Sequence, residues 1–166
     1  MNKSEREERK LLCLQHLTAR EVKERYDSLI WNNYFKFAFV RNPWGRLVSE
    51  FSYRMQKRQD IIKSYGLNNQ SSFEDYICAI RDRNKIIQQK DYVTDIEGNI
   101  IVDFIGRLEN IEDDFKKICK IIGVSCKLEK TNKSVHKDYK QYYDSMSKKL
   151  VEKLYKEDIE LFNYSF

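Results

Sequence analysis

Apolar residues recur along this chain in alternating helical and strand-like patterns. Residues 22–30 carry apolar side chains at helical spacing and predict a helix. Thr18 and Glu21 just before them form the sequence signature of a capping box. Residues 34–40 are short, aromatic and β-branched at their end, so they predict a buried strand.

A tight turn at Arg41, Asn42 and Pro43 follows that strand. Pro43 is the only proline in the chain, and proline suits the first position of a helix but not the middle of a central strand. Residues 34–58 therefore predict a strand, a turn and an amphipathic helix. The apolar stripe of that helix is formed by Trp44, Leu47, Val48, Phe51 and Met55.

The rest of the chain continues the alternation and predicts an α/β domain with helices packed on a mostly parallel sheet. We expect residues 1–10 to be a charged, flexible end and residues 11–166 to form a single domain. The expected elements are a loop over 60–71, a helix capped by Ser72, a strand over 100–105, a helix over 111–122 that Asn110 caps and Gly123 ends, a polar loop over 131–143, and a final helix over 150–162.

Composition excludes several classes of protein. The 166 residues include 31 Lys and Arg against 26 Asp and Glu, a net charge of +5 that suits an anionic ligand but is too diffuse to indicate nucleic acid. No run of about 18 apolar residues is present, so no membrane-spanning helix is expected. The charged N-terminus does not have the apolar stretch of a signal peptide, and we expect a cytoplasmic protein.

Four cysteines stand at positions 13, 78, 119 and 126, and no two of them have the spacing of a zinc knuckle or a thioredoxin-like site. They predict reduced, partly buried thiols, and no metal site is expected.

The turn after the first predicted strand is the candidate anion site. In open α/β sheets, ligands bind beyond the carboxyl ends of strands, and a helix start offers amides and a positive dipole end to a phosphate. Arg41 can present a fork of donors to phosphate oxygens. Ser49, about two helical turns further on, meets the same anion only if the ligand lies along the helix. The alternative is that Arg41 forms a surface salt bridge and Ser49 is an ordinary helical serine.

Three blocks of sequence, in order, resemble the carbohydrate sulfotransferases, which use 3′-phosphoadenylyl sulfate. Residues 37–49 are similar to the segment with which that family binds the 3′-phosphate: a strand, then Arg-Asn/Asp-Pro, then Arg-Leu-x-Ser. Residues 102–115 are similar to the family's downstream strand and helix. The third block is Asn132-Lys133-Ser134 with residues 142–144 and 158–164.

The resemblance implies a P-loop-like α/β fold that transfers a sulfuryl group to a hydroxyl of a carbohydrate acceptor. By position, Arg41 and Ser49 would hold the 3′-phosphate, and Lys133 and Ser134 would lie on a loop that closes over the nucleotide. The same comparison implies that Arg107 and Glu109 form a structural or substrate-side pair.

Transfer also needs a base for the acceptor hydroxyl. Related enzymes place a histidine in the region of His16, so His16 is the candidate catalytic base. Glu21 and Glu109 remain alternatives, and His136 is expected to be exposed or on the acceptor side.

One element of the family pattern is missing. The family opens with a strand, a Pro-Lys-x-Gly/Ala-Thr/Ser-Ser/Thr loop that cradles the 5′-phosphosulfate, and a helix, whereas the first fifteen residues here contain no glycine. Two interpretations follow: a sulfotransferase that has lost its N-terminal part and is impaired, or a nucleotide- or glycan-binding remnant without transfer activity. A basic, tyrosine-rich module for nucleic acid or an acidic partner is a third, but no known nucleic-acid motif supports it.

Overall fold

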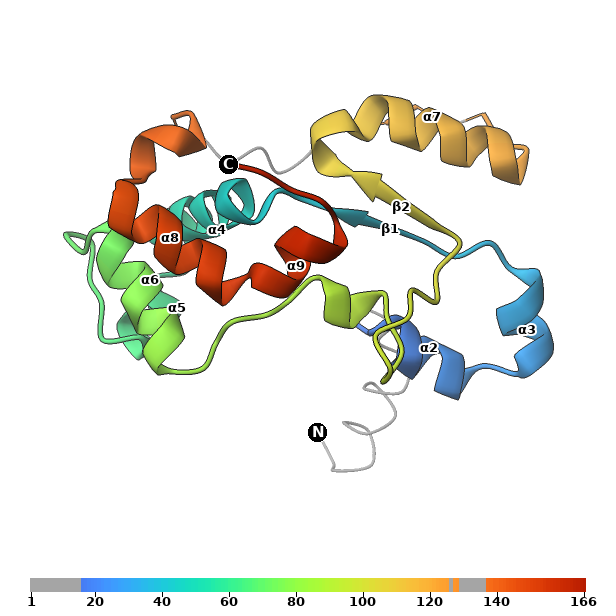
Figure 1. The fold of residues 1–166 in the computed structure, drawn as a ribbon, viewed down its shortest axis with the longest axis horizontal. Coiled ribbons are helices and arrows are strands. Elements are labelled where there is room, and N and C mark those ends of the chain that lie inside the picture. The colour runs from blue at the N-terminus through green and yellow to red at the C-terminus, as the bar shows by residue number, and fades with distance from the viewer. Residues whose placement is uncertain (1–15, 126, 129–136) are drawn as a thin grey trace.

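A computed structural model describes residues 16–125, 127–128 and 137–166 of the chain. Helices and a parallel strand pair alternate along it, which confirms the predicted α/β class (Figure 1). The helices are α2 (Ala19–Arg25), α3 (Ser28–Asn33), α4 (Pro43–Lys57), α5 (Gln59–Ser64), α6 (Phe73–Asp82), α7 (Ile111–Ile122), α8 (Ser145–Leu154) and α9 (Lys156–Leu161). The strands are β1 (Phe37–Val40) and β2 (Phe104–Arg107), and the short 3-10 turns are η1 (Lys90–Tyr92), η2 (Leu108–Asn110) and η3 (Tyr139–Tyr142).

The parallel strand pair β1–β2 determines at which edge of the sheet the helices after each strand begin. β1 and β2 run parallel in a register that pairs Phe37 with Phe104 and Val40 with Arg107. Phe39 pairs with Gly106, and a Cβ at Gly106 would lie 2.5 Å from the Phe39 ring, so only glycine fits beneath it. Because the strands are parallel, both carboxyl ends meet at one edge of the sheet. α4, α5, α6 and α8 gather beyond that edge, and α2 and α3 lie at the opposite end (Figure 1).

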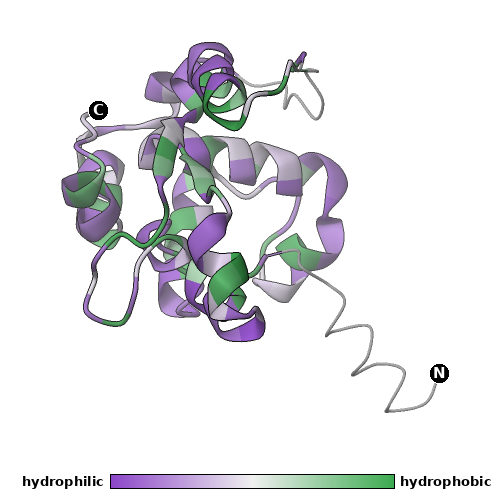
Figure 2. Ribbon diagram, turned by 90° about the vertical axis from the view of Figure 1, so that its right-hand side faces the viewer, coloured by the Kyte–Doolittle hydropathy of each residue, from purple (hydrophilic) through white to green (hydrophobic). Residues whose placement is uncertain are grey.

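The main core lies between α4, α6 and α8. Phe73, Tyr76, Ile77 and Ile80 of α6 are buried, and the apolar stripe of α4 packs against them. A second, smaller cluster of Val40, Val93 and Phe162 packs against the strand pair. Figure 2 shows hydrophilic and hydrophobic residues mixed along the helices. Within the described ranges, no helix combines the length and the apolar character needed to cross a lipid bilayer.

The predicted capping box at Thr18 and the predicted cap at Ser72 both form, but other predicted boundaries are wrong. Thr18 and Ser72 cap α2 and α6 with reciprocal hydrogen bonds. The helix expected over residues 22–30 is two helices, because Asp27 accepts a hydrogen bond from the Leu29 amide and starts α3. The expected final helix is likewise two, α8 and α9, which meet at Tyr155.

Three further boundaries also differ from the sequence prediction. Part of the predicted loop 60–71 is helix α5, whose Ile62 is buried. The second strand runs from Phe104 to Arg107. Its start lies four residues beyond the predicted start at residue 100. Gly123 ends α7 in the left-handed conformation as predicted, but the Asn110 side chain makes no capping hydrogen bond. The expected charged end, residues 1–10, lies outside the described residues.

A carboxylate holds the backbone at each end of β2. Asp103 accepts a hydrogen bond from the Lys36 amide at 2.7 Å and pairs with the Lys36 ammonium at 2.8 Å. Asp114 of α7 accepts from the Arg107 amide at 2.8 Å and from Lys117 at 2.7 Å. These hydrogen bonds lower the pKa of both carboxyl groups below the ordinary value.

The melting temperature is expected to fall most steeply below pH ~4. A carboxyl group with a lowered pKa in the folded state contributes stability above its unfolded pKa of about 3.9 and loses it as pH falls through the folded pKa. In thermal melts from pH 7 to pH 2, Asp103→Asn should therefore lie below wild type at pH 7 and approach it at pH 2. Asp113→Asn, at an exposed pair with Lys116, is the control. A wild-type–Asp103→Asn gap that stays constant with pH contradicts the assignment.

Candidate functional site

The turn between β1 and α4 is held by side chains from distant parts of the chain. The Asn42 amide donates to Glu109 Oε1 at 2.7 Å, and Asn42 Nδ2 donates to the carbonyl of Ser165 at 2.8 Å. Asn42 Oδ1 in turn accepts from the amides of Trp44 at 3.1 Å and Gly45 at 3.5 Å. The first amides of α4 are therefore already paired, which corrects the expectation that they are free for a phosphate. Binding of an anion here depends on side chains.

Arg41 leaves β1 beside the first turn of α4. A Cβ at Gly45 would lie 3.8 Å from Arg41 Nε, so the arginine side chain runs close over that turn. Burial lowers the pKa of the Arg41 guanidinium, while the nearby charge of Glu109 opposes that shift. Among the described residues, no carboxylate oxygen lies within 4.0 Å of this guanidinium. A partly buried cation without such a partner favours an anionic ligand.

Arg41 and Ser49 line the same cavity, which has a volume of about 420 Å³. The cavity runs along one face of α4, because Arg46, Ser49, Glu50 and Tyr53 lie three or four residues apart on the helix. The condition set by the sequence, that a shared ligand must lie along the helix, is thus met geometrically. The lining residues are Arg41, Arg46, Ser49, Glu50, Tyr53, Gln89 and Leu108.

The charges around this cavity favour an anion. Glu50 forms an ion pair with Arg54 at 2.6 Å and accepts a hydrogen bond from the Tyr76 hydroxyl at 3.0 Å. Its negative charge is therefore offset by Arg54 within the fold. The Arg46 guanidinium donates to the carbonyl of Ile87 at 2.8 Å, which is an uncharged partner.

A second cavity of about 220 Å³ shares Arg41 and Leu108 with the first. Arg41, Asn42, Gly45, Leu108, Glu109 and Tyr139 line it. Both carboxylate oxygens of Glu109 are engaged, since Oε1 accepts from the Asn42 amide and Oε2 from the Tyr164 hydroxyl at 3.1 Å.

Arg107 and Glu109, expected as a pair, meet through a shared aromatic residue. The Arg107 guanidinium lies 4.8 Å from the centre of the Tyr164 ring and donates to the carbonyl of Phe162 at 2.6 Å. The Tyr164 hydroxyl donates to Glu109. These contacts connect η2 and the end of β2 to the C-terminal segment.

A larger cavity elsewhere is chemically different. It measures about 490 Å³ and lies between α2, α3 and β1, with mostly apolar residues around it. Its one lysine, Lys36, is held by Asp103 and by the carbonyls of Trp31 at 3.0 Å and Tyr34 at 2.8 Å. The Arg41 cavity is therefore the better candidate for an anionic ligand.

The other predicted site residues are not brought to these cavities. His16 is exposed just before α2, with a φ of 66°, and lines neither cavity that contains Arg41. Glu21 is engaged in the Thr18 capping box. Of the three candidate bases, Glu109 borders a cavity with Arg41. Lys133, Ser134 and His136 lie outside the described residues.

Beyond Arg41 and Ser49, sequence reasoning assigned none of the other five lining residues to the larger Arg41 cavity, among them Glu50, Tyr53 and Gln89. The spacing of Glu50 and Tyr53 from Arg46 and Ser49 on one helix face would have found two of them. Gln89 comes from a polar segment with no periodic pattern, and no sequence signal identifies it. In the part of the chain that the structure covers, no group of three or more His, Cys, Asp or Glu residues is placed to hold a metal ion.

Comparisons with known proteins identify a family that this chain matches. The model of the sulfotransferase family matches residues 2–165. An uncharacterized protein of Archaeoglobus fulgidus is 34% identical over 105 residues, which cover 62% of this chain and 79% of that protein. No solved structure gives a significant match.

Two vertebrate proteins are similar over nearly the whole chain. Carbohydrate sulfotransferase 10 of Gallus gallus is 30% identical over 180 residues, covering 87% of this chain and 49% of the relative. Carbohydrate sulfotransferase 10 of Xenopus laevis is 27% identical over 195 residues, covering 91% and 52%. This chain thus spans about half the length of these two relatives.

Proposed function

Since the chain belongs to the sulfotransferase family, we propose that it binds 3′-phosphoadenylyl sulfate and serves transfer of the sulfuryl group to a carbohydrate hydroxyl. The observation that carries the proposal is the shared cavity of Arg41 and Ser49. Arg41 offers a planar fork of donors to the 3′-phosphate, and Ser49 offers a hydroxyl one and a half to two turns along α4. The names of the two vertebrate relatives support a carbohydrate acceptor.

The transfer step is a substitution at sulfur. The acceptor oxygen forms a bond to sulfur while the bond from sulfur to the bridging oxygen of the phosphosulfate breaks. The acceptor proton passes to a base, for which His16 stays the prediction and Glu109 the alternative. The products are a sulfate ester and adenosine 3′,5′-bisphosphate. Lys133 and Ser134 keep their proposed place on the loop that closes over the nucleotide.

We propose that these 166 residues on their own carry out transfer poorly. The only proline in the chain, Pro43, is followed by Trp44, so the sequence contains no Pro-Lys loop for the 5′-phosphosulfate. Loss of one preorganised donor to a developing negative charge costs about 3 kcal/mol, or a factor of roughly 10² in rate. Nucleotide binding without measurable transfer is the second candidate function, and the same observation favours it.

Adenosine 3′,5′-bisphosphate should raise the melting temperature of the protein more than adenosine 5′-phosphate does. The two ligands differ by the 3′-phosphate alone, so the difference reports the Arg41 cavity. Ser49→Ala should weaken binding of the bisphosphate about tenfold, the effect of one hydrogen bond to a charged group. Thermal melts at matched ligand concentrations measure both. Equal shifts with the two ligands would refute the assignment of the 3′-phosphate.

A transfer assay separates the two candidate functions. The protein is incubated with 3′-phosphoadenylyl sulfate carrying labelled sulfur and with a set of desulfated glycans. Label in the glycan fraction establishes transfer. Selective binding of the bisphosphate with no label in any glycan supports the binding function instead.

A further inference from the structure

The backbone of Arg41 is held by a side chain where the strand pair ends. The last ladder pair joins Val40 to Arg107, so Arg41 is the first residue beyond it. The Arg41 amide donates to Gln89 Oε1 at 2.9 Å, and Gln89 Nε2 donates to the Arg41 carbonyl at 2.8 Å. One carboxamide thus satisfies both backbone groups of Arg41, in the reciprocal way that residues of neighbouring strands pair.

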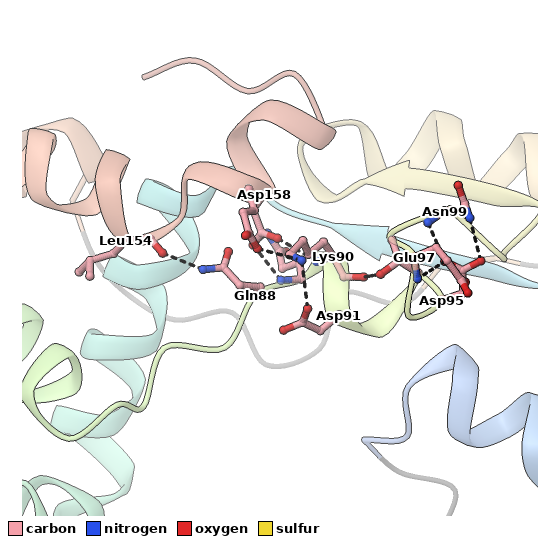
Figure 3. A network of polar contacts seen from close by, with 11 residues as sticks. Gln88, Lys90, Asp91, Asp95, Glu97, Asn99, Leu154 and Asp158 are labelled. Carbon is pink, nitrogen blue, oxygen red and sulfur yellow. Dashed lines mark hydrogen bonds and ion pairs between the residues drawn. The ribbon is translucent and has the colours of Figure 1, made fainter.

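Gln89 is itself anchored by a buried carboxylate. Asp158 of α9 is 0% exposed and accepts from the amides of Gln89 and Lys90, each at 2.8 Å, and from Gln89 Nε2 at 3.4 Å. Figure 3 shows Asp158 directed from α9 toward the segment at Lys90, whereas Gln88 extends the other way toward Leu154. A continuous series of hydrogen bonds therefore runs from α9 through Gln89 to Arg41.

This anchoring limits where the arginine side chain can start. Arginine carries four flexible side-chain torsions, and a bidentate contact to a phosphate requires its planar fork to be placed closely. Gln89 also lines the same cavity as Arg41 and Ser49. A small displacement of the Arg41 backbone would move the guanidinium away from a ligand that the rest of the cavity still admits.

We propose that Gln89 is a positioning residue for Arg41: its carboxamide, anchored by Asp158, fixes the backbone from which the guanidinium reaches the 3′-phosphate. The proposal rests on the proposed function of the cavity. It assigns to residue 89 an influence on ligand selectivity that is separate from its contribution to the fold.

The adjacent glutamine provides a matched control. Gln88 Nε2 donates to the carbonyl of Leu154 at 2.7 Å, while Gln88 Oε1 is buried with no hydrogen-bond partner among the described residues. Gln88→Leu therefore makes the same chemical change one residue away, without touching Arg41. Gln89→Leu should weaken binding of adenosine 3′,5′-bisphosphate about tenfold and that of adenosine 5′-phosphate less than twofold. Gln88→Leu should leave both affinities within about twofold.

A double-mutant cycle by calorimetry tests whether Gln89 acts through Arg41. In an Arg41→Ala background, Gln89→Leu should change binding of the bisphosphate less than about twofold, because the group it positions is gone. Should Gln89→Leu not fold by circular dichroism, Gln89→Met, with a side chain of similar length, replaces it.

The outcomes distinguish failure of the proposed nucleotide site from failure of the positioning role of Gln89. If Arg41→Ala leaves the preference for the bisphosphate intact, the proposed function fails. If Arg41→Ala removes the preference but Gln89→Leu keeps it, the positioning role is wrong and the proposed function stands. Equal weakening of both nucleotides by Gln89→Leu, in both backgrounds, shows a general structural role and likewise overturns the inference.

Discussion

Replacing Arg41 by alanine is expected to weaken binding of adenosine 3′,5′-bisphosphate about 100-fold. The guanidinium lines both cavities at the turn after β1, is partly buried, and has no carboxylate within ion-pair distance in the described part of the chain. Two charge-assisted hydrogen bonds to a phosphate in such surroundings are worth about 3 kcal/mol. Titration calorimetry at constant ionic strength measures the loss. Binding of adenosine 5′-phosphate should change less than about threefold.

Two control variants separate geometry from charge. Arg41→Lys keeps the positive charge but loses the fork, so it should recover only part of the affinity. Arg58→Ala removes an exposed arginine at the other end of α4, where it pairs with Asp60 at 2.9 Å, and should leave binding unchanged. If Arg58→Ala weakened binding as much as Arg41→Ala, a diffuse effect of net charge would explain the data, and the specific site would be wrong.

Replacing Trp44 by alanine is expected to destabilise the fold by about 3–5 kcal/mol, the usual cost of removing a large buried aromatic side chain. Trp44 is buried at the first turn of α4, and its indole donates to the carbonyl of Lys148 at 3.2 Å. The Tyr143 hydroxyl donates to the Trp44 carbonyl at 3.0 Å, and the Phe166 ring lies edge-on at 5.6 Å. For a chain of this length the melting temperature should fall by about 10 °C.

The aromatic control isolates the packing contribution. Trp44→Phe keeps a ring in the core but loses the indole donor, so we expect a cost of about 1–2 kcal/mol. Urea unfolding measures both variants with a common slope. A loss for Trp44→Phe as large as that for Trp44→Ala would mean that the hydrogen bond to Lys148, and not burial, carries the contribution of Trp44.

Local signals in the sequence predicted the parts of the fold that local chemistry decides. The capping box at Thr18 and the helix cap at Ser72 formed because each needs only residues three positions apart. The turn and helix around Pro43 formed for a similar reason, since Asn42 caps the amides two and three positions further on. The start of β2 was wrong because the apolar run from Ile100 does not decide pairing. The strand register does, and it places Gly106 where the Phe39 ring leaves no room for a side chain.

The candidate site was predictable only in part, because its residues come from distant segments. Arg41 and Ser49 were found from a strand–turn–helix pattern, and the structure places them on one cavity. Gln89 and Asp158 lie 48 and 117 residues beyond Arg41, and their hydrogen bonds exist only after the chain has folded back. The amides of α4 were misjudged because the capping role of Asn42 competes with a ligand for the same donors.

The hydrogen bond from Asn42 Nδ2 to the Ser165 carbonyl joins residues that are 123 positions apart in the sequence. A contact of such wide separation requires closure of a long loop, so we expect it to form late in folding. In a chain whose helices have formed but whose C-terminal segment has not docked, the turn after Arg41 would lack the hydrogen bond from Asn42 to Ser165. During refolding, we therefore expect nucleotide affinity to recover later than the helical circular dichroism signal.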